Sequence, residues 1–111
     1  MLAKAAHPRG SIMSLTRDFK ETIKARADRD PEFRRALIEE ATDCLLDNDF
    51  ETAKAILRDY VNATVGFDQL AAAVGTPPKS LMRMLSPKGN PQAKSLLPVI
   101  AHIRKREKIA A

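Results

Sequence analysis

The stretch from 67 to 86 restricts the fold most, because it combines two short helical patterns with a turn of defined chemistry. Two helices that cross at about 90–120° through a tight turn need a small residue at the crossing, which Ala71 supplies. The turn needs a residue that tolerates positive φ, and Gly75 follows Ala71 by four positions. Thr76 and Pro77 then supply a cap and a first helical position. We therefore expect two crossing helices joined at Gly75.

Apolar residues in this stretch recur where they would close a small core between the two helices. We expect five side chains to face inward: Leu70, Val74, Leu81, Met84 and Leu85. The second helix should span about 77–85. Nowhere does the chain show the alternation of apolar and polar residues that suits a strand, so the expected fold class is all-α.

Three amphipathic segments precede this stretch and predict additional N-terminal helices over about 18–64. A capping box at Asp18-Phe19-Lys20-Glu21 opens the first segment, near 18–28, which places Phe19, Ile23 and Ala27 on one face. Asp30-Pro31 starts the second segment, whose apolar stripe is Phe33, Leu37, Ala41 and Cys44/Leu45 and which Asp47-Asn48-Asp49 interrupts. The third segment covers about 50–64, with Ala53, Ile56/Leu57, Tyr60 and Ala63 on one face and Gly66 as its stop.

The length of 111 residues fits one small domain, which we expect over 14–111 after a lead-in at 1–13. Met13 is a candidate translation start, because the helical pattern begins just after it. The chain has one Cys, no secretory pattern near its N-terminus and no apolar run of the roughly 20 residues that a membrane span needs. These features favour a soluble cytoplasmic protein with no membrane partner.

Charge is unevenly distributed along the chain. Residues 1–27 carry a net +4, residues 28–66 a net −5 and residues 67–111 a net +6. A basic C-terminal third suits a polyanionic partner, although a solvated surface would give the same sum.

The spacing of Ala71, Gly75, Leu81 and Met84 resembles the helix-turn-helix of the Cro and lambda-repressor-like family. Gly89-Asn90-Pro91 and the apolar pattern after Ser95 resemble the loop and helix that follow the second helix of that family. In this register Ser95 would cap the last helix and Pro98 would fall at N3, where the missing N–H has no partner to lose. The resemblance implies a lambda-repressor-like DNA-binding domain.

Residues 30–103 further resemble addiction-module antidote proteins, the HigA-like antitoxins and related regulators. The shared residues run in order from Asp30-Pro31-Glu32 and Leu57-Arg58-Asp59 through the helix-turn-helix to Leu85-Ser86 and Gly89-Asn90-Pro91. The resemblance implies a transcriptional autorepressor of a toxin–antitoxin module that binds a palindromic operator as a homodimer. The acidic middle of the chain suggests a basic partner such as a ribonuclease-type toxin, although a plain structural role for this helix pair is as consistent with its charge.

In this family the second helix enters the major groove of double-stranded DNA. The positions that would face the bases are Pro78, Lys79, Met82 and Arg83. Arg83 is the best candidate for direct readout, because a guanidinium pairs with guanine O6 and N7. The positions that would contact the DNA backbone are Gln69, Thr76, Pro77, Ser80, Lys88, Asn90 and Lys94. Proline at 78 departs from the polar residue common there, which shifts weight from base contacts to DNA shape.

Catalysis has little support in the sequence, and we expect no enzyme activity, cofactor or metal. His7 and His102 lie far apart, and Cys44 falls on an apolar stripe, so a core thiol is expected there. The competing interpretation is a protein-interaction module that has kept the helix-turn-helix fold and lost DNA binding, for which the double proline is the argument.

Overall fold

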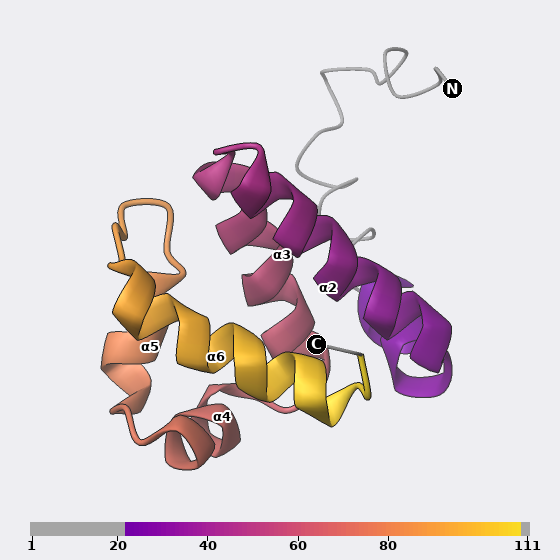
Figure 1. Cartoon of the computed structure of the whole chain (residues 1–111). Helices are drawn as coiled ribbons and strands as arrows, with labels where there is room; N and C mark the ends of the chain where they lie inside the picture. Colours follow the sequence, from indigo (N-terminus) through magenta and orange to yellow (C-terminus); the bar gives the residue numbers. More distant parts are fainter. Residues whose placement is uncertain (1–21, 110–111) are drawn as a thin grey trace, which may run out of the picture.

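The computed structural model describes residues 22–109, which contain helices and no strand (Figure 1). Five helices have both ends in this range: α2 (Pro31–Leu46), α3 (Phe50–Ala63), α4 (Phe67–Val74), α5 (Pro78–Met84) and α6 (Ala93–Arg106). Residues 22–29 are also helical. The expected all-α class is thereby confirmed. The lead-in at 1–13, Met13 and the capping box at 18–21 lie outside the described residues. None of the described helices has the length and apolar character that crossing a membrane requires.

Aspartates cap the starts of α2 and α3, and of these the sequence predicts Asp30. The Asp30 carboxylate accepts a hydrogen bond from the Phe33 N–H at 3.1 Å, and Pro31 occupies the first turn. The backbone hydrogen bond from Phe33 is the main reason why the pKa of Asp30 lies below its usual range. The Asp49 carboxylate accepts from the Thr52 N–H at 3.2 Å. The turn between the helices places Asn48 at a φ of 67°, a conformation that asparagine tolerates.

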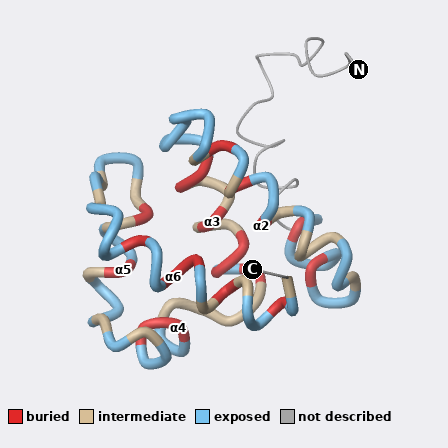
Figure 2. The backbone as a smooth tube through the Cα atoms, in the orientation of Figure 1, coloured by how far each residue is buried: buried red, intermediate tan, exposed pale blue. Residues whose placement is uncertain are grey.

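The main core lies between α2, α3, α4, α5 and α6 (Figure 2). Its fully buried side chains are Ile38, Leu57, Tyr60, Val61, Leu70, Leu81, Leu85, Val99 and Ile103. A smaller cluster forms where Ile23 and Ala27 meet Ala63, with Phe33 and Leu37 packed against it. The predicted stripe of α2 is therefore wrong in one respect. It omits Ile38, which is fully buried because α2 packs on both clusters and not on one.

The sequence predicts that Gly66 stops α3. The Gly66 N–H does donate to the Val61 carbonyl of the last turn at 2.8 Å, but Gly66 is not the C-cap. The helix ends at Ala63 with Thr64 as its C-cap, and the Thr64 hydroxyl donates to the Tyr60 carbonyl at 2.7 Å. Gly66 instead occupies the N-cap position of α4, with a φ of 83° and a ψ of 155° that only glycine adopts without strain.

The connection between α4 and α5 is a tight turn through Gly75. This glycine is the C-cap of α4 and has the expected left-handed conformation, with φ 73° and ψ 30°. The predicted cap of the next helix is wrong by one position: Pro77 is the N-cap, Pro78 is the first residue of α5, and the Thr76 side chain makes no capping hydrogen bond. The reason is steric, because a residue before proline is excluded from the helical region, and Pro77 accordingly has a ψ of 143°.

Helix α6 begins earlier than predicted. Gln92 is its N-cap, and the Gln92 carbonyl accepts from both the Ser95 and the Leu96 N–H at 3.0 Å. Ser95 is therefore not the cap, and Pro98 lies inside the helix and not at N3. Two good helix formers, Ala93 and Lys94, extend the helix toward its N-terminus. Pro98 is exposed, and because it has no N–H it leaves the Lys94 carbonyl without its usual intrahelical partner.

The C-terminal end of α6 is fastened to α2 and α3 by the buried carboxylate of Glu107. This carboxylate accepts hydrogen bonds from Arg34 Nε at 3.1 Å, from Arg106 at 2.7 Å and from the Tyr60 hydroxyl. Burial acts to raise the pKa of Glu107, but the hydrogen bonds from Tyr60 and Arg34 and the two guanidinium charges outweigh it and leave the pKa below its usual range. Burial together with the Glu107 charge raises the pKa of Tyr60 to about 12.

Candidate functional site

Helix α5 has one buried side and one exposed side. Leu81 and Leu85 at its C-cap are fully buried against the core, and Met84 is half-buried. On the outer side, Pro78, Lys79, Met82 and Arg83 are exposed, and Met82 is 46% exposed despite being apolar. All four positions predicted to face DNA bases therefore point away from the core. The residues predicted to build the motif, Leu70, Ala71 and Leu81, are buried as expected, and Val74 is half-buried.

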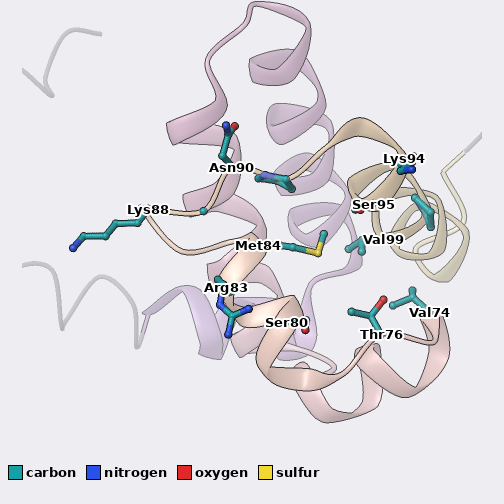
Figure 3. Close-up of a pocket in the computed structure, with 13 residues that line it drawn as sticks. Val74, Thr76, Ser80, Arg83, Met84, Lys88, Asn90, Lys94, Ser95 and Val99 are labelled. Atoms are coloured by element: carbon teal, nitrogen blue, oxygen red, sulfur yellow. The ribbon is translucent and has the colours of Figure 1, made fainter.

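A hollow of about 620 Å³ opens between α5, the loop that follows it and the start of α6 (Figure 3). Six residues predicted to contact DNA line it: Thr76, Ser80, Arg83, Lys88, Asn90 and Lys94. Met84 extends toward Val99 across its floor, while Lys88 reaches outward from the loop (Figure 3). The hollow thus brings together cations from three separate segments of the chain.

The two helices that border this hollow begin without acidic residues or side-chain caps. Helices α2, α3 and α4 each have an Asp or Glu in the first turn, whereas α5 and α6 have none. The first turn of a helix carries unpaired N–H groups and a partial positive charge, which acidic residues usually offset. Here Lys79 and Lys94 occupy those first turns instead. Both helix starts therefore add to the positive potential of this surface.

The positive charge of this surface is not neutralised within the described residues. Lys79, Arg83, Lys88 and Lys94 take part in none of the ion pairs formed there. From 67 to 109 the chain has two carboxylates, of which Glu107 is buried in its ion pairs and only Asp68 is exposed. An anion that approaches α5 and α6 would therefore meet more cations than carboxylates, of which the exposed Glu51 of α3 reaches the loop through its ion pair with Lys54.

Gln69 is not brought to this hollow, although the sequence analysis grouped it with the backbone-contacting residues. It lines a second, shallower hollow of about 690 Å³ with Val65, Ala72, Ala73, His102, Lys105 and Arg106. The reason is that Gln69 lies on the outer face of α4, which turns toward the C-terminal half of α6. Pro77 is exposed at the N-cap of α5, outside the lining of the first hollow.

Two cations of α3 that the sequence analysis did not select contact the loop after α5. Lys54 Nζ donates to the Pro87 carbonyl at 3.3 Å and to the Gly89 carbonyl. Arg58 donates to the Leu85 carbonyl. Lys54 is 2% exposed, which is rare for lysine. The only signal in the sequence is that Lys54 falls next to Ala53 and Leu57 on the buried face of its helix.

The cysteine and histidine side chains, which often carry chemistry in proteins, do not form a further site within the described residues. Cys44 is buried, and desolvation followed by the charge of Glu40 raises the pKa of its thiol, which keeps it protonated. His102 is half-buried on α6, and His7 lies outside the described residues. Within residues 22–109, no three His, Cys, Asp or Glu side chains are grouped so that they could hold a metal ion.

Comparison of the chain with protein-family models, curated proteins and solved structures found no match.

Proposed function

We propose that the chain is a sequence-specific DNA-binding regulator that places α5 in the major groove of double-stranded DNA. The observation that carries the proposal is the division of α5. Its buried side, at Leu81 and Leu85, holds the helix in the core, and its exposed side presents Lys79, Met82 and Arg83 to the solvent. A major groove about 12 Å wide accepts one α-helix in this way.

The surface around α5 suits the phosphates on either side of such a groove. Lys88, Asn90 and Lys94 lie beside α5, and the uncapped start of α6 offers backbone N–H groups of the kind that bind phosphate. In this arrangement Arg83 reads guanine, and Pro78 makes apolar contact, for example with a thymine methyl group. Part of the specificity then comes from DNA shape.

The regulatory role that we propose is that of a homodimeric repressor of the antitoxin type. It is supported by the resemblance of residues 30–103 to addiction-module antidote proteins and by the separation of charge between α2–α3 and α5–α6.

A second candidate function is protein–protein interaction at the turn between α2 and α3. Leu46 is 80% exposed and Phe50 45% exposed there, beside the exposed carboxylates of Asp43, Asp47 and Asp49. An apolar pair ringed by acidic groups suits a basic partner, such as the ribonuclease-type toxin that the resemblance implies. DNA binding and partner binding would use opposite charges on different helices.

Salt dependence tests the DNA-binding proposal. A duplex selected from a random pool by the intact protein should lose affinity steeply as salt rises, with a slope of about 0.9 per neutralised phosphate in a plot of log affinity against log salt. Lys88→Ala should weaken all duplexes similarly and reduce that slope by about 1, whereas Arg83→Ala should cost about 1–3 kcal/mol of discrimination at one base pair. Fluorescence anisotropy measures both quantities.

The matched control is Lys24→Ala, which removes an exposed lysine from residues 22–29, on the side of the molecule away from α5 (Figure 1). It should leave affinity, slope and discrimination close to those of the wild type. DNA affinity that does not change with salt concentration would contradict this docking of α5. So would an Arg83→Ala variant that discriminates between base pairs as well as the wild type.

A further inference from the structure

The C-terminal end of α5 and the loop after it present carbonyl groups to α3. The last carbonyls of a helix have no intrahelical partner and carry a partial negative charge. Here the Leu85 carbonyl, at the C-cap of α5, accepts from Arg58, and the Pro87 and Gly89 carbonyls both accept from Lys54 Nζ. Two cations that lie one helical turn apart on α3 therefore bind three carbonyl groups of the short segment 85–89.

Lys54 is fully occupied by this task. An ammonium group has three N–H donors, and the structure gives Lys54 Nζ three partners: the Pro87 carbonyl, the Gly89 carbonyl and the Glu51 carboxylate at 3.2 Å. Since Lys54 is buried and Glu51 is 72% exposed, the loop carbonyls are the partners that fix the ammonium inside the protein. A buried lysine is costly unless its charge is compensated in this way.

Gly89 shows how tightly the same loop lies on α5. A Cβ atom at Gly89 would meet the Arg83 carbonyl oxygen at 2.1 Å and the Met84 carbonyl oxygen at 2.6 Å, both closer than real Cβ contacts allow. The loop therefore packs directly on the last turn of α5, the turn from which the Arg83 side chain projects. Lys88 and Asn90 lie on either side of Gly89, so the end of α5 and the loop behave as one body anchored to α3.

We propose that Lys54 and Arg58 are positioning residues for DNA binding. They set the orientation of α5 and of the loop at 86–90 relative to α3 without contacting DNA themselves. This inference rests on the proposed function, because it assigns to α3 the control of that surface. Loss of either cation lets the end of α5 and the loop shift together relative to α3, so that Arg83 and Lys88 no longer meet base and phosphate in the orientation that the anchor fixes.

The test uses the intact chain with Lys54→Met, which keeps the length of the side chain and removes its donors. Affinity for the selected duplex should fall on the order of tenfold, as expected for the loss of charged hydrogen bonds. The slope of log affinity against log salt should stay at the wild-type value, because Lys54 neutralises no phosphate. Amide hydrogen exchange at residues 82–90 should accelerate, while exchange in α2 keeps its wild-type rates.

Two further variants separate positioning from general destabilisation. Arg58→Met should reproduce the loss and Arg58→Lys should restore most of it, because lysine can still donate to the Leu85 carbonyl. Arg58 is half-buried, so this pair also serves if Lys54→Met does not fold. Tyr60→Phe is the matched control, because its hydroxyl bonds Glu107 and Arg106 and not the loop after α5. Below its unfolding temperature this variant should bind DNA as the wild type does.

Each outcome decides the matter. A wild-type protein that binds no duplex at low salt overturns the proposed function and this inference with it. A wild type that binds DNA beside a Lys54→Met variant of equal affinity overturns the inference alone. A Lys54→Met slope reduced by about 1 also overturns it, because Lys54 would then be a phosphate contact.

Discussion

Glu107 shows how much of this fold depends on one side chain. Its carboxylate lies just after α6 and receives hydrogen bonds from Arg34 of α2, Tyr60 of α3 and its neighbour Arg106. No described buried side-chain nitrogen or oxygen is left without a hydrogen-bond partner, so these charges are compensated. Such groups are costly to break individually, because removing one partner leaves the others buried and unpaired.

Stability should therefore depend on pH through Glu107. The pKa of this carboxyl in the folded protein is below its ordinary value of 4.5, so its contribution is fully present above about pH 5 and is lost as pH falls through the folded-state pKa. At pH 7, Glu107→Gln should lower the free energy of unfolding by about 2 kcal/mol, a moderate figure because Arg34 and Arg106 retain contact with water. Urea unfolding of the wild type and of Glu107→Gln at pH 7 and at pH 4 measures the free energy of unfolding under both conditions.

The difference between wild type and Glu107→Gln should shrink as pH falls below the ordinary pKa of 4.5, because the unfolded chain then takes up a proton that the folded protein, with its lower pKa, still lacks. A difference that stays constant from pH 7 to pH 3 would show that the ionised carboxylate is not what fastens α6. The buried thiol of Cys44 reports on whether the protein is folded. It should stay unreactive toward thiol reagents for as long as the fold persists.

At the level of elements, α5 is too short to persist alone. Its seven residues are fewer than the roughly 12–15 that an isolated helix needs, so its conformation depends on the turn before it and the loop after it. Gly75 supports the turn before α5 and Gly89 supports the loop after it, for different physical reasons. Gly75 supplies a left-handed backbone conformation in open space, and Gly89 supplies the absence of a side chain.

Substitutions at the two glycines should distinguish the effect of backbone conformation at Gly75 from the effect of close packing at Gly89. Gly75→Ala should cost about 1 kcal/mol of unfolding free energy from backbone strain, and Gly75→Asn should cost less because asparagine tolerates this conformation. Gly89→Ala should cost about 2 kcal/mol, because its Cβ would displace the end of α5. Urea unfolding gives the three values. Equal losses for Gly75→Ala and Gly75→Asn would contradict the conformational explanation.

The sequence predicted the elements well wherever local chemistry decides them. Asp30-Pro31 and Gly75 have the conformations expected, because caps and left-handed turns depend on nearby residues. The start of α5 lies one residue later than the sequence predicts, because Pro78 excludes Pro77 from the helical region. The start of α6 lies earlier than predicted, because Gln92 and not Ser95 caps a longer helix with Pro98 on its exposed face.

The contacts between distant segments could not be predicted in this way. Lys54 and Gly89 are 35 positions apart, and Arg34 and Glu107 are 73 apart. A charged residue on the buried face of a helix shows only that some partner exists, since the partner is chosen by the packing of other helices. For the same reason, the sequence indicated the cations of the candidate site but not that Gln69 lies on a different surface.

At the scale of the whole molecule, opposite charges lie on different helices. The exposed carboxylates gather on α2 and the turn to α3, while α5, the loop after it and α6 carry most of the exposed cations. This separation orients the molecule in the field of a polyanion, with the basic surface leading. It also keeps the acidic surface accessible while the basic surface is occupied.

In the proposed docking one α5 would reach only a few base pairs, so two copies are expected on one operator. Half-sites in a selected duplex should lie about 10 base pairs apart, or a multiple of that, and should be related by two-fold symmetry. Native mass spectrometry of the complex should show two chains on a palindromic duplex. An isolated half-site should bind the protein more weakly than this duplex. A full-affinity complex with one chain would contradict the proposed dimer.

The division of α5 into a buried and an exposed side has a consequence for how such proteins diversify. The side chains at 79, 82 and 83 contribute little to the core, so they can be exchanged at little cost in stability, whereas Pro78 also fixes the start of α5. If α5 reads DNA as proposed, a lineage carrying this scaffold could acquire new operators through substitutions at these three surface positions, while Leu81 and Leu85 keep α5 seated in the core.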